Sequence, residues 1–302
     1  MNILLSGGTG FIGGALVERL VQRGDFGVIY TRGRSHFDSE NIKYINSLDE
    51  IPEEEYFECF INLAGESMAQ GRWSERRKAI LVESRVGTTR ELVALAQRLQ
   101  RPPAVVLSAS AIGYYGHHGD DFLSEDAPPQ EGFSHRLCQA WESEARRFEQ
   151  LGSRVCRLRL GVVLGPALPG GGGGALVELS KSFRFGIGTW LGGGGQWLSW
   201  VHRDDVLAAM EFLLENGELA GAFNLTAPEP VTNKGFCMAL RHHLGAIVCL
   251  PVPGLVLRLA LGEMADELLL KGQRVVPRRL QEAGFEFRYN SLTEALPNLL
   301  AR

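Results

Sequence analysis

The chain has 302 residues, of which 45% are hydrophobic and 22% are charged, and its formal net charge is −4. These values are typical of a globular protein, and the weak negative charge argues against nucleic acid or an anionic membrane surface as a partner. A helix that spans a bilayer needs about 18 consecutive apolar residues, and no segment of this sequence has such a run. The five cysteines include no C-x-x-C pair, which indicates reduced thiols. We therefore expect a cytoplasmic monomer or homodimer without a signal peptide or metal site, acting on a small molecule.

The most informative stretch is residues 3–13, where an apolar run ends in a glycine cluster and an amphipathic segment follows. Gly8, Gly10 and Gly13 have the G-x-G-x-x-G spacing. Gly7, taken with the same last two glycines, gives a G-x-x-G-x-x-G variant. Such glycines permit a tight strand-to-helix turn and close approach of the backbone to a pyrophosphate at a helix N-terminus. The residues predicted to bind the cofactor here are Gly7, Gly10, Phe11, Ile12 and Gly13.

The first half of the chain alternates short apolar runs with helical patterns, which is typical of a parallel sheet built from βαβ units. The predicted strands are residues 3–5, 28–31, 59–63, 105–108 and 155–160. The predicted helices are residues 11–23, 75–99 and 133–150. Right-handed crossovers between such strands give a doubly wound, Rossmann-type α/β fold.

The second half has a different character, with glycine runs at residues 170–174 and 192–195. We predict that these runs are mobile loops that close over a substrate. Helical patterns occupy residues 175–185, 206–214, 232–244, 255–261, 266–270, 278–284 and the stretch from 292, with a short strand at 223–225. The expected division is a nucleotide-binding domain of residues 1–164 plus 201–225, and a smaller C-terminal substrate lobe of residues 165–200 plus 226–302.

The end of the second strand bears on cofactor choice. An acidic residue at this place binds the ribose of NAD, but here the strand ends in Thr31 and Arg32. Arg32 suits a 2′-phosphate, Thr31 adds a hydroxyl, and Arg34 reinforces the positive charge. Two alternatives stay open: Arg32 is a solvated loop residue, or Asp38 or Glu40 folds back onto a ribose and restores NAD. The sequence favours NADP(H) over NAD.

Further motifs together suggest a family. They are Asn62-Leu63-Ala64-Gly65, Ser108-Ala109-Ser110-Ala111 followed by Tyr114-Tyr115-Gly116, the segment 159–166, and the segment 200–206. With these motifs the sequence resembles the extended and atypical short-chain dehydrogenase/reductases, the NAD(P)-dependent epimerase/dehydratase group, over nearly its whole length. The resemblance implies a Rossmann fold and a cofactor bordered by Leu63, Ala64, Gly65, Arg85 and Val162.

A narrower resemblance rests on other segments: Arg72-Trp73, Ala140-Trp141-Glu142, Gln196-Trp197 and the tail at residues 269–280. These are similar to the bacterial "epimerase family protein" set, related to the human short-chain dehydrogenase/reductase family 39U and carrying a distinctive C-terminal domain. This implies NADP binding. It does not name a substrate, because a shared fold does not determine function.

The catalytic residues of the superfamily are where this chain departs from the pattern. There, a tyrosine with a lysine four residues later does the acid–base work beside a serine that binds the carbonyl oxygen. None of the tyrosines here has such a lysine, and the corresponding helix positions hold Ser134 and Cys138. Ser110 remains as the serine, and Tyr114 or Tyr115 is the candidate acid or base. The alternative for the two tyrosines is aromatic packing.

Other residues have two interpretations each. Arg85 reaches the cofactor or is a surface arginine, and Gln196, Trp197 and Trp200 line a substrate pocket or belong to the core. For His202 we favour a capping role at a helix start over a metal site. The leading hypothesis is an NADP(H)-binding, epimerase/dehydratase-like oxidoreductase acting on a carbonyl or carbinol carbon, with a nucleotide sugar as one candidate by analogy. The alternative is a catalytically silent NADP(H)-binding regulatory or interaction protein.

Overall fold

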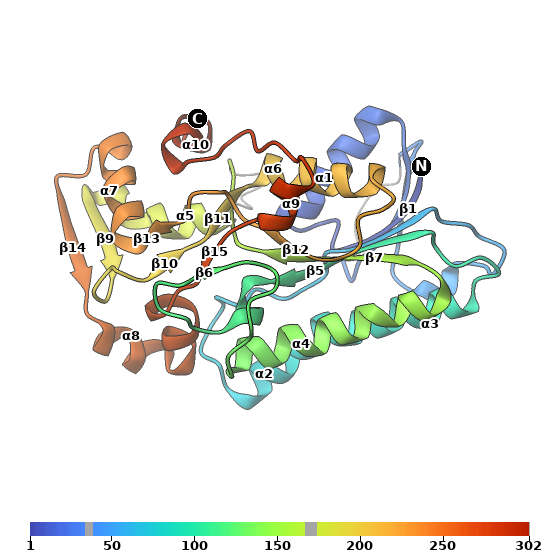
Figure 1. Cartoon of the computed structure of the whole chain (residues 1–302), viewed down its shortest axis with the longest axis horizontal. Coiled ribbons are helices and arrows are strands. Elements are labelled where there is room, and N and C mark those ends of the chain that lie inside the picture. Colours follow the sequence, from blue (N-terminus) through green and yellow to red (C-terminus); the bar gives the residue numbers. More distant parts are fainter. Residues whose placement is uncertain (34–38, 167–173, 302) are drawn as a thin grey trace.

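A single parallel sheet organises the first part of the chain. The computed structural model describes residues 1–33, 39–166 and 174–301. Seven parallel strands lie in the order β12-β7-β5-β4-β1-β2-β3 (Figure 1). The strands are β1 Asn2–Ser6, β2 Phe26–Tyr30, β3 Ile42–Ile45, β4 Cys59–Asn62, β5 Val105–Ala111, β7 Arg154–Leu160 and β12 Gly221–Leu225. This order confirms the predicted doubly wound sheet, with its direction of growth reversing between β1 and β4.

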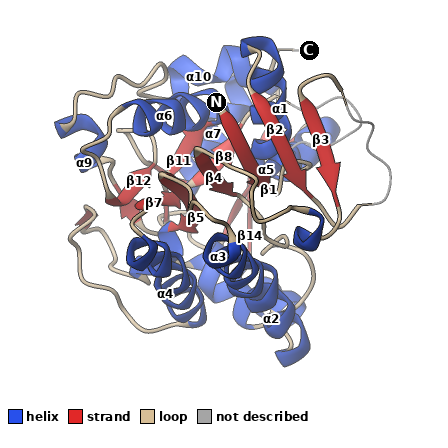
Figure 2. Cartoon of the chain, turned by 90° about the vertical axis from the view of Figure 1, so that its right-hand side faces the viewer, coloured by secondary structure: helices blue, strands red, loops and turns tan. Residues whose placement is uncertain are grey.

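Helices cover both faces of the sheet, as Figure 2 shows. On one face lie α1 (Phe11–Arg23) and α6 (Arg203–Glu215); on the other lie α3 (Thr88–Arg98) and α4 (Phe133–Ala145). Successive side chains of a strand point to opposite faces. In β1, Ile3 and Leu5 therefore join the core under α1 and α6, while Leu4 joins the core under α3.

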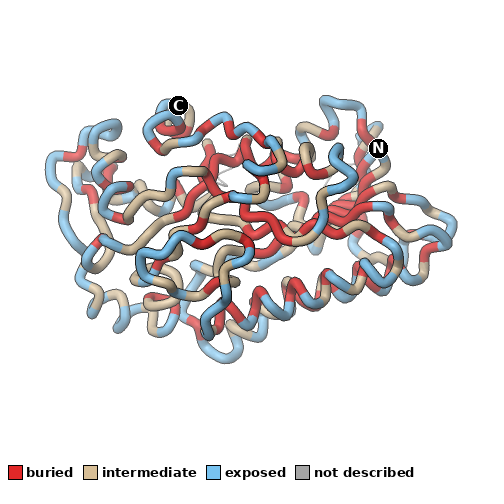
Figure 3. Tube along the Cα trace, viewed as in Figure 1, coloured by how far each residue is buried: buried red, intermediate tan, exposed pale blue. Residues whose placement is uncertain are grey.

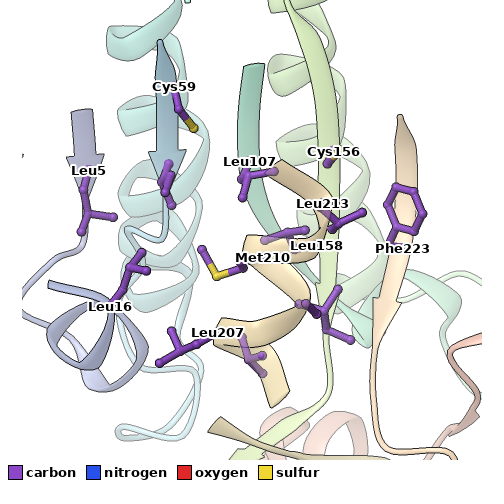
Figure 4. Packing of buried hydrophobic residues seen from close by; sticks show 14 of the residues in the cluster. Leu5, Leu16, Cys59, Leu107, Cys156, Leu158, Leu207, Met210, Leu213 and Phe223 are labelled. Carbon is purple, nitrogen blue, oxygen red and sulfur yellow. The ribbon is translucent and has the colours of Figure 1, made fainter. Parts of the chain in front are cut away.

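The core under α1 and α6 shows why these segments are helices. Leu16 of α1 and Leu207, Met210 and Leu213 of α6 recur at helical spacing and pack on Leu107, Leu158 and Phe223 of the sheet (Figure 4). Full burial of such a side chain contributes about 1.5–3 kcal/mol. Figure 3 shows the buried residues concentrated along the sheet and the inner faces of its helices.

Three features of this domain differ from expectation. Strand β3 was not predicted, because a run of four residues with Lys43 and Tyr44 inside it carries little hydrophobic periodicity. The helix expected over residues 75–99 is divided into α2 (Glu75–Val82), a π-helical turn (Glu83–Gly87) and α3. The helix expected over 133–150 is α4 followed by a 3₁₀ segment (Arg146–Leu151).

Most of the rest of the chain forms short paired strands and helices at the end of the molecule away from the N-terminus, whereas α9 (Arg278–Glu282) packs on β12 of the central sheet (Figure 1). The pairs are β8 (Val162–Leu164) with β11 (Trp200–His202), β9 (Ile187–Leu191) with β14 (Val248–Val252), β10 (Trp197–Leu198) with β13 (Val231–Thr232), and β6 (Phe122–Leu123) with β15 (Arg274–Val275). The helices are α5 (Gly174–Ser180), α7 (Asn233–Leu244), α8 (Gly254–Leu261), a π-helical segment (Ala265–Leu270), α9 (Arg278–Glu282) and α10 (Leu292–Leu299).

This second part has its own apolar core, in which Trp200 is fully buried among side chains of α5, α7 and α10. The glycine run at residues 170–174, predicted to form a lid, lies almost entirely outside the described residues. No helix in the described ranges combines the length and apolar character needed to cross a bilayer.

Candidate functional site

The site lies at the carboxyl ends of β1 and β4, where the sheet order reverses. In doubly wound sheets this switch point is the place where ligands bind. Asn62, the last residue of β4, accepts from Ser6 Oγ at 2.6 Å and donates to Thr89 Oγ1 at 2.8 Å. Its Oδ1 also accepts from the backbone N–H of Ala64. The buried amide of Asn62 therefore fixes the loop at residues 63–65 beside the glycine-rich turn.

The glycine-rich turn leaves no room for side chains. Gly7 has φ of 78°, in the region that favours glycine. A Cβ on Gly13 would lie 2.1 Å from the carbonyl oxygen of Gly7, and a Cβ on Gly7 would lie 2.6 Å from the carbonyl carbon of Leu63. These contacts bring α1 and the loop after β4 against one turn of bare backbone.

The N-terminus of α1 faces this turn. Gly10 at the helix start provides no side-chain cap, and the first turn contains no acidic residue. The free N–H groups and the positive end of the helix dipole therefore remain available to an anion. The residues present fit the diphosphate of a dinucleotide cofactor.

A cavity of about 470 Å³ opens on one side of the turn. Its wall combines the glycine-rich turn with the loop after β4, strand β5, helix α4, strand β8 and the C-terminal π-helical segment. The structure brings to this cavity the predicted residues Gly7, Gly10, Phe11, Ile12, Gly13, Leu63, Ala64, Gly65, Arg85, Ser110 and Val162.

A second hollow lies on the other side of the same turn and shares Gly7, Gly10 and the loop 63–65 with the cavity. Thr31 and Arg32, at the end of β2, line it. The guanidinium of Arg32 is 76% exposed and donates from Nη2 to Glu66 Oε1 at 2.8 Å. An exposed pair of this kind is weak, so Arg32 is free to bind a phosphate. Arg34 and Asp38 lie outside the described residues, and Glu40 is exposed.

Beneath the cavity wall, Glu142 of α4 is the centre of a buried polar network. Its carboxylate accepts from Arg159 Nε at 2.8 Å and Nη2 at 3.1 Å, from Arg157 at 3.5 Å, and from Ser110 Oγ at 2.9 Å. Burial opposes the charge on Arg159, but its hydrogen bonds to Glu142 and Tyr115 raise the pKa of Arg159 above its ordinary value. Ser110 has one proton, which it donates to Glu142, so its oxygen can only accept from a ligand.

The two tyrosines predicted as acid or base do not line the cavity. The 3₁₀ turn after β5 (Ile112–Tyr115) directs Tyr115 into the core, where it is fully buried, donates to Asn224 Oδ1 at 2.6 Å and accepts from Arg159. Burial raises the pKa of Tyr115 to about 12. The ring of Tyr114 stacks on the Arg159 guanidinium with 3.5 Å from its centroid to Cζ. The structure therefore does not bring the predicted acid or base, Tyr114 or Tyr115, to this cavity, and the two rings pack against each other with centroids 5.5 Å apart.

The two helix positions that the resemblance assigns to the superfamily's tyrosine and lysine face the cavity. Ser134 and Cys138 of α4 line it, and the buried Ser134 Oγ has no hydrogen-bond partner among the described residues. Burial raises the pKa of Cys138 to about 11, so the thiol is neutral near pH 7. Neither side chain supplies the fixed positive charge of a lysine.

Arg85 provides the cation of this cavity wall. It lies in the π-helical turn between α2 and α3, and its guanidinium lies over the Trp141 ring, 5.4 Å from the centroid. It donates to the carbonyl oxygens of Leu81 and Glu66 and to Ser84 Oγ. Burial lowers the pKa of Arg85, and no described carboxylate forms an ion pair with it. Arg85 is therefore not the surface arginine of the alternative interpretation.

Three cavity residues come from the C-terminal part, and two of them, Glu267 and Leu268, were missed by sequence reasoning. Glu267 accepts from the backbone N–H groups of Phe133 and Ser134, both at 3.1 Å, and so caps α4, whose own Gly132 provides no side chain. Gln273 also lines the cavity. The missing local cap at Gly132 was the only available sequence signal, and it does not indicate which distant residue supplies the cap.

Several other predicted residues have structural roles. Trp200 belongs to the second core, Gln196 donates to the carbonyl oxygens of Leu191 and Leu269, and Trp197 donates to Asp120. None of the three lines the cavity, and of the three only Trp200 belongs to a core cluster. His202 caps α6 by accepting from the N–H of Asp204 at 3.0 Å, as predicted.

Comparison with known proteins agrees with this geometry. The model of the NAD dependent epimerase/dehydratase family matches residues 3–226, and a domain of unknown function (DUF1731) matches residues 252–299. The chain belongs to the NAD dependent epimerase/dehydratase family. It is 37% identical to the epimerase family protein YfhF of Bacillus subtilis over 306 aligned residues, covering 100% of this chain and 98% of that protein.

Two solved structures share the fold of the chain along nearly its whole length. The human epimerase family protein SDR39U1, solved with NADPH, is 30% identical with a TM-score of 0.87, and the match covers 99% of each chain. UDP-glucose 4-epimerase of Thermotoga maritima, solved with UDP-glucose, has a TM-score of 0.77 at 21% identity, covering 99% of this chain and 97% of that one. The second likeness concerns the fold alone.

Proposed function

We propose that the chain is an NADP(H)-dependent oxidoreductase that holds a small carbonyl or carbinol compound in the cavity beside helix α4. The observation that carries this proposal is the continuity of the site. The uncapped N-terminus of α1 lies between a hollow lined by Thr31 and Arg32 and an apolar cavity lined by Ser110. This arrangement suits a dinucleotide that places one nucleotide in the hollow and the other in the cavity.

The residues that would hold NADP(H) are those of the glycine-rich turn, the loop at residues 63–65 and Arg32. When bound, the cofactor supplies or takes up a hydride. Ser110 would orient the substrate, because its lone pairs accept from a carbinol hydroxyl while its own proton stays on Glu142. The apolar wall residues Ile112, Leu137 and Trp141 exclude water from the reacting carbon.

Replacing Arg32 tests the cofactor assignment. Arg32→Ala should weaken NADPH binding about 10-fold or more, since it removes a charged hydrogen-bond donor to the 2′-phosphate. NADH, which lacks that phosphate, should bind with an affinity within about 3-fold of the wild type. Calorimetric titration with both nucleotides measures this difference. Equal weakening of the two would contradict the role given to Arg32.

Replacing Ser110 tests the reaction. We expect NADP⁺-dependent oxidation of at least one compound in a panel of small secondary alcohols, whose hydroxyl can donate to Ser110 Oγ. Ser110→Ala should lower kcat at least about 10-fold, because one hydrogen bond to the reacting oxygen is lost, while NADPH affinity stays unchanged. Ser108→Ala is the matched control, since Ser108 lies on the same strand but does not line the cavity. Unchanged kcat in Ser110→Ala would remove Ser110 from the mechanism.

A second function has its own support. Ser134 and Cys138 occupy the positions of the superfamily's acid–base pair, and neither can carry that chemistry near pH 7. A protein that binds NADPH and signals its presence without turnover fits these substitutions. Tight NADPH binding together with no turnover across the panel would favour this second function over the oxidoreductase.

A further inference from the structure

The hydrogen-bond partners of the Arg85 guanidinium are uncharged, and some of its N–H donors form no hydrogen bond to a described residue. Its Nη1 donates to Leu81 O and Ser84 Oγ, both at 3.3 Å, and its Nη2 donates to Glu66 O at 2.8 Å. A guanidinium has five N–H donors. The Nε proton and one Nη2 proton have no partner among the described residues. Free N–H donors on one guanidinium can bind the two oxygens of a carboxylate through parallel hydrogen bonds.

Residue 65, which lies against the Arg85 guanidinium, is a glycine and so places no side chain on it. A Cβ on Gly65 would lie 3.0 Å from Arg85 Cζ, 3.1 Å from Nη2 and 3.3 Å from Nε, so any side chain at residue 65 would press on the guanidinium. The nearby Glu66 carboxylate instead faces Arg32 and Arg77. Arg85 therefore lines the cavity without an ion-pair partner among the described residues.

The one carboxylate of the cavity wall is already occupied. Both oxygens of Glu267 accept backbone N–H groups at the start of α4, whose positive dipole end neutralises the charge. The Trp141 ring lies over the Arg85 guanidinium and Cys138 lies near it, while Met68, Leu137 and Leu268 add apolar surface to the same cavity. A single unpaired cation in an apolar wall fits an apolar molecule that bears one negative charge.

We propose that Arg85 is the substrate-recognition residue of the cavity and that the substrate is an apolar carboxylate. The inference rests on the proposed function only in taking this cavity as the substrate site. One arginine matches the single charge and the two oxygens of a carboxylate. The fixed guanidinium would then orient the acid so that its apolar body extends along α4.

Two probes of equal shape test the proposal: cyclohexanecarboxylate and its uncharged isostere cyclohexanecarboxamide. Their binding to the full chain is measured by calorimetry with and without NADPH. The wild type should bind the carboxylate at least about 10-fold more tightly than the amide, since charged hydrogen bonds are the stronger ones. Arg85→Met should abolish this preference and leave the NADPH affinity unchanged.

Arg90→Met is the matched control, because Arg90 lies on the exposed side of α3 and does not line the cavity. It should keep the preference for the carboxylate. Equal binding of the two probes to the wild type, or binding of neither, overturns the proposal. The proposal is also overturned if Arg85→Met lowers the affinity for NADPH as much as it lowers the affinity for cyclohexanecarboxylate, since Arg85 would then bind the cofactor. If NADPH does not bind at all, the proposed function is contradicted. The titrations of the carboxylate and the carboxamide without NADPH still decide the role of Arg85.

Discussion

Glu142→Ala should lower the free energy of unfolding by about 3–5 kcal/mol, the cost of removing one partner from a buried ion pair. The side chains of Glu142 and Arg159 are 1% and 4% exposed, so the charge of Arg159 would be left without water or a counterion. The lost hydrogen bond would also release the hydroxyl of Ser110. Chemical denaturation with the midpoint and slope fitted separately measures the change.

Glu144→Ala provides the comparison for this prediction. Glu144 lies two residues further along α4 and forms ion pairs with Arg147 and Arg90, which are 41% and 59% exposed. Surface pairs contribute at most about 1 kcal/mol. A Glu142→Ala variant no less stable than Glu144→Ala would show that the buried network contributes nothing to the fold.

Gly13→Ala should weaken NADPH binding about 100-fold. The added Cβ would lie 2.1 Å from the carbonyl oxygen of Gly7 and 2.8 Å from Gly8 Cα, both backbone atoms. The turn must therefore move by about an ångström, and losing one hydrogen bond to the charged diphosphate, about 1.5–3 kcal/mol, weakens binding by about two orders of magnitude. Overpacking should also cost about 1–3 kcal/mol of stability, so binding is measured calorimetrically below the unfolding transition.

Gly217→Ala is the matched glycine replacement. A Cβ at residue 217 meets no atom within 4 Å, so both stability and NADPH binding should stay at the wild-type level. If Gly13→Ala bound NADPH as tightly as Gly217→Ala, the glycine-rich turn would not be part of the nucleotide site.

Local sequence signals predicted much of this molecule. The apolar runs and helical periodicity gave the sheet and its covering helices, and the glycine spacing placed a turn where the structure has one. Strand β3 escaped prediction because its four residues do not alternate clearly. The π-helical turn around Arg85 also escaped, since an extra residue in a helical turn leaves the surrounding periodicity almost unchanged.

The candidate site was harder to predict, because its chemistry depends on contacts between distant residues. The sequence placed Ser110 and Tyr115 five residues apart, but only the fold shows that Ser110 lines the cavity while Tyr115 turns into the core toward Asn224. Glu267 reaches the start of α4 across more than a hundred residues. Periodicity and short motifs contain no information about such pairings.

The most direct test of the account is a calorimetric titration of the wild-type chain with NADPH and with NADH. We expect saturable binding of NADPH and at least about 10-fold weaker binding of NADH, because only the former offers a phosphate to Arg32. No heat of binding with either nucleotide up to millimolar concentration would contradict the central claim that the turn at residues 7–13 holds a dinucleotide.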